Sequence, residues 1–435
     1  MHANQEFPVG PRPVYLSGWR RNLRRLSMLP MFIRYLSHPS QYPRFILRRS
    51  RNGFLRTLEI ERQLGLTKFI SFNGSLFASL SLPHFPSAAF DYAASRGALN
   101  VGGMGTDAKL HIDNAILAIT SRCEYGCSHC YERRNIGSSE LVPIERWQEV
   151  IAQLQEIGVS IVILSGGEPM LRFDGVLELL RSGDKNRSDF HVHTSGAGVT
   201  AERARTLRDA GLTAAAVGLD DVDPARFDAL RGKRGAFDQA VKALVHFNNA
   251  GIFTYTNLCL TPQLVRSGDL WKYFELAREL HVGLIELLEP RPCGGYRGKT
   301  MESLFTEADR KAVREFIDAG NHDVRYRDYP LLYSIPEIEH PSRLGCTMGG
   351  LSHLTIDSSG SVNPCVFVPI SFGNILHENL APIVSRMRQA VPTPIHAGCG
   401  SVLLADLLEA HNKDGKRTSR RFEEIEDEWH ARLGV

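Results

Sequence analysis

Three cysteines, Cys123, Cys127 and Cys130, lie within one short segment of the 435-residue chain. Their C-x3-C-x2-C spacing directly follows an apolar run, residues 115–120, which predicts a β-strand. Three thiolates grouped in this way can bind three irons of a [4Fe–4S] cluster and leave the fourth iron without a protein ligand. A cofactor or a substrate could bind at that open iron. The alternatives are structural thiols and a zinc site with His129 as fourth ligand, although structural zinc usually takes two separated cysteine pairs.

A second motif, Gly166-Gly167-Glu168-Pro169, follows the apolar run of residues 161–164. Glycines let a backbone approach a ligand closely, and the end of a strand offers carbonyl groups to an ammonium group. By itself this motif is an ordinary turn. Its position one helix after the cysteine motif indicates that both belong to one site.

The two motifs together resemble the signature of the radical S-adenosylmethionine (SAM) superfamily. The resemblance implies that the reduced Cys123/Cys127/Cys130 cluster cleaves SAM to methionine and a 5′-deoxyadenosyl radical, which abstracts hydrogen from an unactivated C–H bond. It also implies an electron donor such as a flavodoxin or a ferredoxin. The cofactors carry this chemistry, and the protein orients them and excludes water. The cofactor-binding residues that the resemblance implies are His129, Gly166, Gly167, Glu168, Pro169, Ser195 and Asp220.

Three of these residues are assigned by matching landmarks of the family. Ser195 and Gly196 match the Ser-Gly turn that ends the family's third strand, near the methionine end of SAM. Asp220 ends a Gly-Leu-Asp segment where family members commonly have Ser-Leu-Asp, so Gly218 departs from the family pattern. His129 is expected to pack near the adenine.

Strand-like and helix-like segments alternate from about residue 113 to 320, which predicts a parallel sheet. Residues 143–157, for example, carry apolar side chains at helical spacing between Pro143 and Gly158. Six such repeats predict an α/β fold, a partial (β/α)6 TIM-like barrel, and the family resemblance implies the same core with SAM at the C-terminal strand ends. We expect an N-terminal extension at 1–110, the barrel at 111–325, a small cluster-binding β-hairpin and helix domain at 326–410, and a charged tail at 411–435, most simply a solvated helix.

A second set of cysteines, Cys346, Cys365 and Cys399, lies near the C-terminus. The C-x13-G-x4-C stretch resembles the opening of the SPASM and twitch auxiliary-cluster domains of radical SAM enzymes, and residues 352–364 predict a β-hairpin. The cysteine-dense run of a full SPASM domain is missing, so the resemblance implies one auxiliary [4Fe–4S] cluster, which would accept the substrate electron or anchor the substrate. Its fourth ligand could be Cys293, His396 or the substrate, with a slight preference for an open site.

Other polar residues of the barrel have two interpretations each. His191 and His193 alternate along one strand face, either lining the active site or lying in the core. Cys259 is expected to be a small buried hydrophobic residue. Glu286 lies inside an apolar strand, where a carboxylate is costly unless paired, so it faces either the substrate or a buried arginine.

Composition indicates a globular protein without a membrane span or a secretory signal, because no apolar run reaches eighteen residues. Eight cysteines without a secretory route are better explained as reduced metal ligands, so we expect a cytoplasmic protein. The net charge of +3 hides a basic front, whose residues 1–58 contain no lysine and one acid, Glu6. Its arginines are Arg12, Arg20, Arg21, Arg24, Arg25, Arg34, Arg44, Arg48, Arg49, Arg51 and Arg56.

The sequence is compatible with two classes of substrate. Maturation of a ribosomal peptide is common in this group, although no segment predicts an obvious leader-binding winged helix. The basic front suggests instead a lipid or another anionic small molecule, with peripheral membrane contact through residues 1–58. A non-enzymatic iron–sulfur or zinc protein is the third hypothesis, and it predicts that SAM is not bound.

Overall fold

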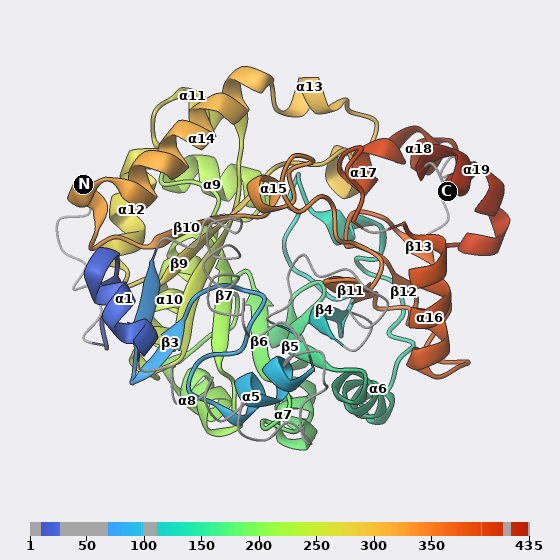
Figure 1. The fold of residues 1–435 in the computed structure, drawn as a ribbon, viewed down its shortest axis with the longest axis horizontal. Coiled ribbons are helices and arrows are strands. Elements are labelled where there is room, and N and C mark those ends of the chain that lie inside the picture. Colours follow the sequence, from blue (N-terminus) through green and yellow to red (C-terminus); the bar gives the residue numbers. More distant parts are fainter. Residues whose placement is uncertain are drawn as a thin grey trace.

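The computed structural model describes residues 10–26, 68–96, 98, 111–392, 394–411 and 419–433. Its centre is a nine-stranded sheet with the strand order β10-β9-β8-β7-β6-β5-β4-β11-β12 (Figure 1). Neighbouring strands from β4 to β9 all pair in parallel, which confirms the predicted α/β barrel. These strands are β4 (Ile112–Ala118), β5 (Val159–Ser165), β6 (Asp189–Thr194), β7 (Ala214–Gly218), β8 (Phe253–Cys259) and β9 (Leu284–Leu288).

Helices connect these strands and cover the outside of the barrel (Figure 1). They are α6 (Ile144–Glu156), α7 (Phe173–Ser182), α8 (Ala201–Asp209), α9 (Pro224–Arg231), α10 (Ala236–Asn249), α11 (Pro262–Arg266), α12 (Leu270–Glu279), α13 (Met301–Leu304) and α14 (Glu307–His322). Helix α6 follows its sequence pattern closely, because Trp147, Val150 and Leu154 recur at helical spacing and are all buried. The chain then leaves the helix through Gly158, whose φ of 88° favours glycine.

Further strands extend the sheet at both edges. Strand β10 (Leu331–Ser334) pairs in parallel with β9, and β11 (His353–Ile356) pairs in parallel with β4. Strand β12 (Val362–Asn363) pairs antiparallel with β11, which confirms the predicted hairpin. The domain boundary expected at residue 325 therefore cuts one continuous sheet, so the hairpin that carries Cys365 at its end is held in register with the barrel.

The described part of the N-terminal extension closes the barrel interior at the N-terminal ends of its strands. An antiparallel sheet of β1 (Val14–Leu16), β2 (Phe69–Phe72) and β3 (Ser75–Phe77) packs there, with Phe77 stacked on Phe253 at a centroid distance of 3.9 Å. The helices of this part are α1 (Gly18–Leu26) and α5 (Ala88–Ser95), and α5 packs on β5 of the barrel. Most of the arginines of the basic front, from Arg34 to Arg56, lie outside the described residues.

The charged tail is not simply a solvated helix, as its sequence suggested. Its described part contains β14 (Arg420–Arg421), which pairs with β13 (Ile370–Ser371), and α19 (Glu426–Leu433). Trp429 is fully buried, and its indole N–H donates to the carbonyl of Ala390 at 2.9 Å. The alternating charges hide this contact, because one helix face carries the buried side chains. The other C-terminal helices are α15 (Ile335–Ile338), α16 (Leu380–Ala390), α17 (Gly400–Leu403) and α18 (Ala405–His411).

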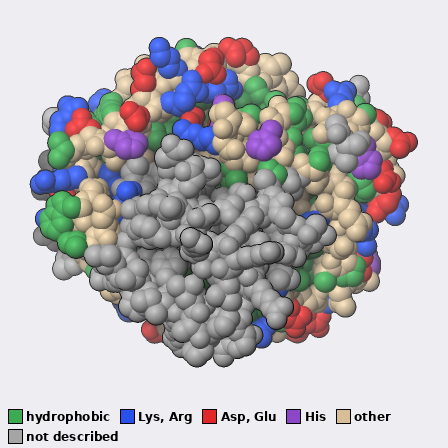
Figure 2. Space-filling model, in the orientation of Figure 1, with side chains coloured by type: hydrophobic (Ala, Val, Ile, Leu, Met, Phe, Trp, Pro, Cys, Tyr) green, Lys and Arg blue, Asp and Glu red, His purple; other side chains and the backbone are tan. Residues whose placement is uncertain are grey.

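Charges of both signs are mixed along the described upper rim of the molecule. Figure 2 shows basic and acidic side chains interspersed along the edge that α13 and α14 form in Figure 1. Several of them pair, as Arg314 does with Glu307 at 2.5 Å. None of the helices within the described ranges combines the length and the apolar character that crossing a membrane requires.

Candidate active site

The first cysteine motif lies in the loop that follows β4, at the C-terminal end of the barrel strands. The loop is held against the end of α9, because the backbone N–H of Gly126 donates to the carbonyl of Arg231 at 3.1 Å. Cys127 is buried, Cys123 and Cys130 are partly exposed, and all three thiols are free. Burial raises the pKa of Cys123 and of Cys127, and it raises that of Cys130 to about 12. A metal would supply the positive charge that ionises such thiols, so the donor set fits an iron–sulfur cluster.

The glycine-rich motif packs directly onto this cysteine loop. The N–H of Gly167 donates to the carbonyl of Thr120, and the N–H of Glu168 donates to the carbonyl of Arg122, each at 2.8 Å. A Cβ atom would lie 2.4 Å from the oxygen of Thr120 at Gly166, and 2.3 Å from the oxygen of Arg122 at Gly167. The two glycines are therefore needed for contact between the two loops themselves. The structure brings both predicted motifs together at one end of the barrel.

Glu168 is buried and joins the ends of β5 and β6. One carboxylate oxygen accepts from the N–H of Met170 at 3.0 Å and from the hydroxyl of Thr194 at 2.7 Å. The other accepts from the N–H and the hydroxyl of Ser195, at 2.8 and 2.5 Å. Burial raises the pKa of Glu168, and these four hydrogen bonds oppose that effect. The carboxylate thus positions Ser195, while direct pairing of Glu168 with a SAM ammonium group stays a prediction.

Asp220 lies beside the cysteine loop and is paired with a buried arginine. Its Oδ2 atom is 2.6 Å from Nη2 of Arg231 and 3.5 Å from Nε2 of His129. Nη1 of Arg231 lies 3.9 Å from Sγ of Cys127, so one guanidinium group contacts both Asp220 and a cluster cysteine. Burial lowers the pKa of His129, which keeps the imidazole neutral beside this pair. The sequence did not single out Arg231, which is the last residue of α9 and follows Asp220 in the chain.

The second set of cysteines also converges. Cys346 pairs with Ile395 through two backbone hydrogen bonds of 3.0 and 2.9 Å, which brings the segment before Cys399 alongside. The thiols of Cys346 and Cys399 are hydrogen-bonded, and this contact and the guanidinium of Arg291 lower the pKa of Cys399. Burial raises the pKa of Cys365, whose environment includes Cys399. Cys346 and Cys399 are thus neighbours, and Cys365 and Arg291 belong to their electrostatic surroundings.

Cys293 lies between the two cysteine groups. Burial raises its pKa to about 12, and its electrostatic neighbours include both Cys399 and Cys130. The next residues pack on the first cysteine loop, because the N–H of Gly295 donates to the carbonyl of Cys130 at 2.9 Å. His396, the other protein candidate, is exposed, and its Nδ1 atom is hydrogen-bonded to the carbonyl of Pro341 at 2.9 Å. Of the two candidates, Cys293 is the one that lines a cavity together with an auxiliary cysteine, Cys365.

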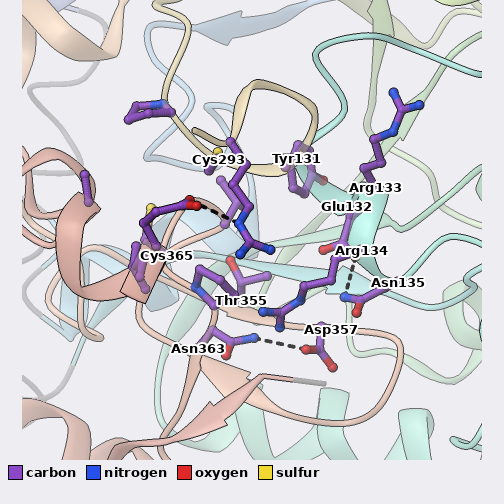
Figure 3. Close-up of a pocket in the computed structure, with 18 residues that line it drawn as sticks. Tyr131, Glu132, Arg133, Arg134, Asn135, Cys293, Thr355, Asp357, Asn363 and Cys365 are labelled. Carbon is purple, nitrogen blue, oxygen red and sulfur yellow. Dashed lines mark hydrogen bonds and ion pairs between the residues drawn. The ribbon is translucent and has the colours of Figure 1, made fainter. Parts of the chain in front are cut away.

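A cavity of about 190 Å³ lies between the two cysteine groups (Figure 3). Cys293 and Cys365 face it from two sides, together with Tyr131 and Glu132 of the segment after Cys130. Burial raises the pKa of Glu132 to about 7, while Asn135 donates to its carboxylate at 2.8 Å. The cavity connects the segment that follows the first cysteine loop with the auxiliary site.

Inside the barrel, His191 and His193 share one partner. The hydroxyl oxygen of Tyr255 is 3.2 Å from Nδ1 of His191 and 2.9 Å from Nε2 of His193. Burial lowers the pKa of His191 to about 4 and that of His193 to about 3, so both rings are neutral at pH 7. Cys259 is partly exposed near Asp220, and its N–H donates to the Asp220 carboxylate at 2.9 Å.

Comparison with known proteins agrees with this geometry. Residues 117–267 match the profile of the "Radical SAM superfamily", and residues 346–393 match the SPASM profile, described as an "Iron-sulfur cluster-binding domain". The PqqA peptide cyclase of Streptomyces rochei is 28% identical over 254 residues, which cover 58% of this chain and 68% of that protein. The AdoMet-dependent heme synthase of Methanosarcina barkeri (strain Fusaro / DSM 804) is 26% identical over 309 residues, which cover 65% of this chain and 86% of that protein.

The fold is similar to that of solved structures at low sequence identity. Streptococcus suis SuiB, in its structure bound to precursor peptide SuiA, superposes with a TM-score of 0.55 at 16% identity. The match covers 86% of this chain and 88% of that one. It extends the likeness beyond the two family profiles to most of the chain.

Proposed function

The chain belongs to the radical SAM superfamily, with a C-terminal SPASM iron–sulfur domain, and we propose that it modifies a ribosomal peptide by abstracting hydrogen from an unactivated C–H bond. The packing of the glycine-rich turn on the cysteine loop, with Gly166 and Gly167 too close for any side chain, carries the catalytic part of this proposal. The peptide class draws support from the relatives, one of which is named as a peptide cyclase.

In this proposal Cys123, Cys127 and Cys130 hold a [4Fe–4S] cluster, and the chain's polar residues hold SAM beside it. The cluster and SAM, when bound, supply a 5′-deoxyadenosyl radical. Carbonyl groups of the glycine-rich turn receive the ammonium group, and Glu168 fixes Ser195 toward the methionine end. His129 packs near the adenine. The partial burial of the cysteine loop would limit the access of water to this chemistry.

Cys346, Cys365 and Cys399 hold the auxiliary cluster in this proposal, and Cys293 completes its ligand set. Cys293 faces the same cavity as Cys365 and lies electrostatically next to Cys399 (Figure 3). Arg291 offsets the negative charge that four thiolates would bring. An auxiliary cluster at this place would accept the substrate electron or anchor the substrate.

The proposal is tested on anaerobically reconstituted protein with SAM and dithionite. We expect about eight irons per chain, production of 5′-deoxyadenosine, and a mass change in a short peptide encoded beside the gene. The Cys123→Ala/Cys127→Ala/Cys130→Ala variant should retain about four irons and produce no 5′-deoxyadenosine. Wild-type iron content in that variant, or a wild-type protein that does not cleave SAM, would contradict the catalytic assignment.

A second candidate substrate class is an anionic lipid or small molecule at a membrane surface. Helix α1 favours it, because Trp19 and Leu23 are 67% and 55% exposed beside Arg20 and Arg21. Apolar and basic side chains lie next to each other where α1 forms the edge of the molecule (Figures 1 and 2). Such a helix suits the interface of an anionic membrane.

A further inference from the structure

The inward faces of the barrel strands form layers with different surroundings. Toward the N-terminal strand ends, Ala214, Phe253 and Leu284 are fully buried beneath the N-terminal sheet. Above the register row of Ala216, Tyr255 and Leu284, the next inward row contains the cross-strand neighbours Gly218, Asn257, Glu286 and Tyr333. Gly218, Asn257 and Glu286 of this row are partly exposed although they lie on interior strands. The barrel therefore encloses open space at this level, below the C-terminal ends that carry the SAM site.

The hydrogen bonds of this space can be assigned a direction. The amide nitrogen of Asn257 lies 3.4 Å from Nδ1 of His193, and because an amide nitrogen only donates, Nδ1 is the acceptor. Nε2 of His193 then carries the proton and donates to the hydroxyl oxygen of Tyr255 at 2.9 Å. Tyr255 in turn donates to Nδ1 of His191 at 3.2 Å. Three hydrogens, one each from Asn257, His193 and Tyr255, are used within this chain of bonds, and none of the three is directed to Glu286 or to Oδ1 of Asn257.

Two acceptors on neighbouring strands receive none of these hydrogens. Oδ1 of Asn257 is buried and has no hydrogen-bond partner within the described part of the chain. Glu286, its direct cross-strand neighbour, forms no hydrogen bond or ion pair with the residues that the structure describes. Among the residues described, no arginine or lysine influences its carboxyl group, and desolvation inside the barrel raises its pKa to about 7. The buried arginine partner that the sequence left open for Glu286 is therefore not found among these residues.

The buried amide oxygen of Asn257 costs free energy because it has no donor, and the partly exposed carboxylate of Glu286 stands beside it inside the barrel without a cation. These two adjacent acceptors are explained if a bound molecule supplies the hydrogen-bond donors. We propose that Glu286 and Asn257 form a binding site for a protonated amine of the substrate, such as a lysine side chain or an amino-terminal group. An ammonium group has three N–H donors and one positive charge, so it satisfies both acceptors and keeps the carboxylate ionised.

This inference rests on the proposed function, since the amine would belong to that enzyme's substrate. The inference adds an orientation of the substrate. An amine bound below the SAM site would hold the adjoining carbon atoms of the substrate within the barrel, beneath Asp220 and Cys259. Tyr333, on the other side of Glu286, supplies an aromatic wall for the carbon chain. Glu286 acts here as a binding residue and takes no part in bond cleavage.

The test uses reconstituted holoenzyme with SAM bound and two probes of equal size, n-butylammonium and 1-butanol, in anaerobic titration calorimetry. We expect the amine to bind the wild type and to bind E286Q about tenfold more weakly or worse, because a charge-assisted hydrogen bond is lost. Asn257→Ala should weaken the amine as well. Butanol should not distinguish the proteins. Glu302→Gln, an exposed carboxylate on α13, serves as the matched control and should behave as the wild type.

Absence of amine binding to the wild type, or equal amine affinity in E286Q and the wild type, overturns the inference. Iron content and circular dichroism of each variant report whether it has folded. If E286Q does not fold, the amine affinity of Asn257→Ala decides whether the inference holds. 5′-Deoxyadenosine production is measured on the same samples. A wild-type protein that binds the amine without cleaving SAM would sink the proposed function alone, whereas SAM cleavage without selective amine binding would sink this inference alone.

Discussion

The guanidinium group of Arg231 occupies the space beside Gly218, where a Cβ atom would lie 2.3 Å from its Nη2 atom. From this position Arg231 reaches Asp220 at 2.6 Å and the sulfur of Cys127 at 3.9 Å. The Gly-Leu-Asp sequence, which departs from the usual Ser-Leu-Asp of the family, therefore has a steric reason. A larger residue at this position would displace a buried cation from the cysteine loop.

Gly218→Ala should therefore lower both stability and SAM cleavage. Overpacking of this kind costs about 1–3 kcal/mol, and displacement of Arg231 leaves Asp220 without its cation. We expect a corresponding loss in the free energy of unfolding and about a tenfold lower rate of 5′-deoxyadenosine production. Chemical denaturation of the apoprotein and the anaerobic assay of the holoenzyme measure the two effects.

The Arg231→Ala background provides the control. If the clash with Arg231 is the cause, then Gly218→Ala should have little additional effect once the guanidinium is absent. Additive losses in the double variant would show that Gly218 is needed for another reason.

The sequence predicted most of the barrel and both cysteine groups, because these features are local. Cysteine spacing, the glycine-rich motif and helical periodicity are each readable within a few residues. The role of Arg231 depends on Gly218 thirteen positions earlier, and the position of Cys293 depends on glycines packing on Cys130, so neither has a local signal. Likewise, pairing of β11 with β4 joins segments far apart in the chain, which composition and periodicity do not reveal.

Glu168→Gln should weaken SAM binding and leave the iron content unchanged. The amide would place an N–H₂ group toward either the N–H of Met170 or the N–H of Ser195, so at least one hydrogen bond becomes a donor–donor contact. Hydrogen bonds to a charged group contribute about 1.5–3 kcal/mol, so we expect the KM for SAM to rise about tenfold or more. Glu178→Gln, on the exposed face of α7, is the control. Equal 5′-deoxyadenosine production by Glu168→Gln and wild type at low SAM concentration would refute the role.

Cys293→Ser should change the auxiliary cluster, whereas Cys259→Ser should not. The comparison is clearest in the Cys123→Ala/Cys127→Ala/Cys130→Ala background, where only the auxiliary cluster remains. Mössbauer spectra should show one altered iron site, and loss of iron to a chelator should be faster, because a serine oxygen is a harder ligand than a thiolate. Spectra identical to those of the parent would mean that the fourth iron is open or has another ligand.

Lys68 should be a major anchor of the N-terminal sheet. It is fully buried, and its ammonium group donates to the carbonyls of Gly320, Tyr326 and Tyr329 at 3.0, 2.6 and 3.2 Å. Lys68→Met retains the apolar stem and leaves three carbonyls without their donor, so we expect a loss of about 2–4 kcal/mol in the free energy of unfolding. Lys311→Met is the control, because this side chain on α14 is 73% exposed, and it should change the free energy of unfolding little. Equal stability of the two variants would contradict the anchoring role.

The membrane-surface alternative makes a prediction about α1 that does not require its removal. Deletion of residues 1–58 would also remove β1, which pairs with β2, so a point variant is the cleaner test. Trp19→Ser/Leu23→Ser removes the exposed apolar face and keeps the arginines.

We expect wild-type protein to pellet with anionic vesicles at low salt, less at high salt, and not with neutral vesicles, since each arginine near an anionic surface contributes about 1 kcal/mol. The double variant should lose at least about tenfold in affinity, because two apolar side chains no longer insert. Val324→Ser, at a residue 70% exposed elsewhere on the surface, should pellet as the wild type does. If wild-type protein stays in the supernatant with anionic vesicles at low salt, α1 is not a membrane-binding helix, and the peptide class stands without this competitor.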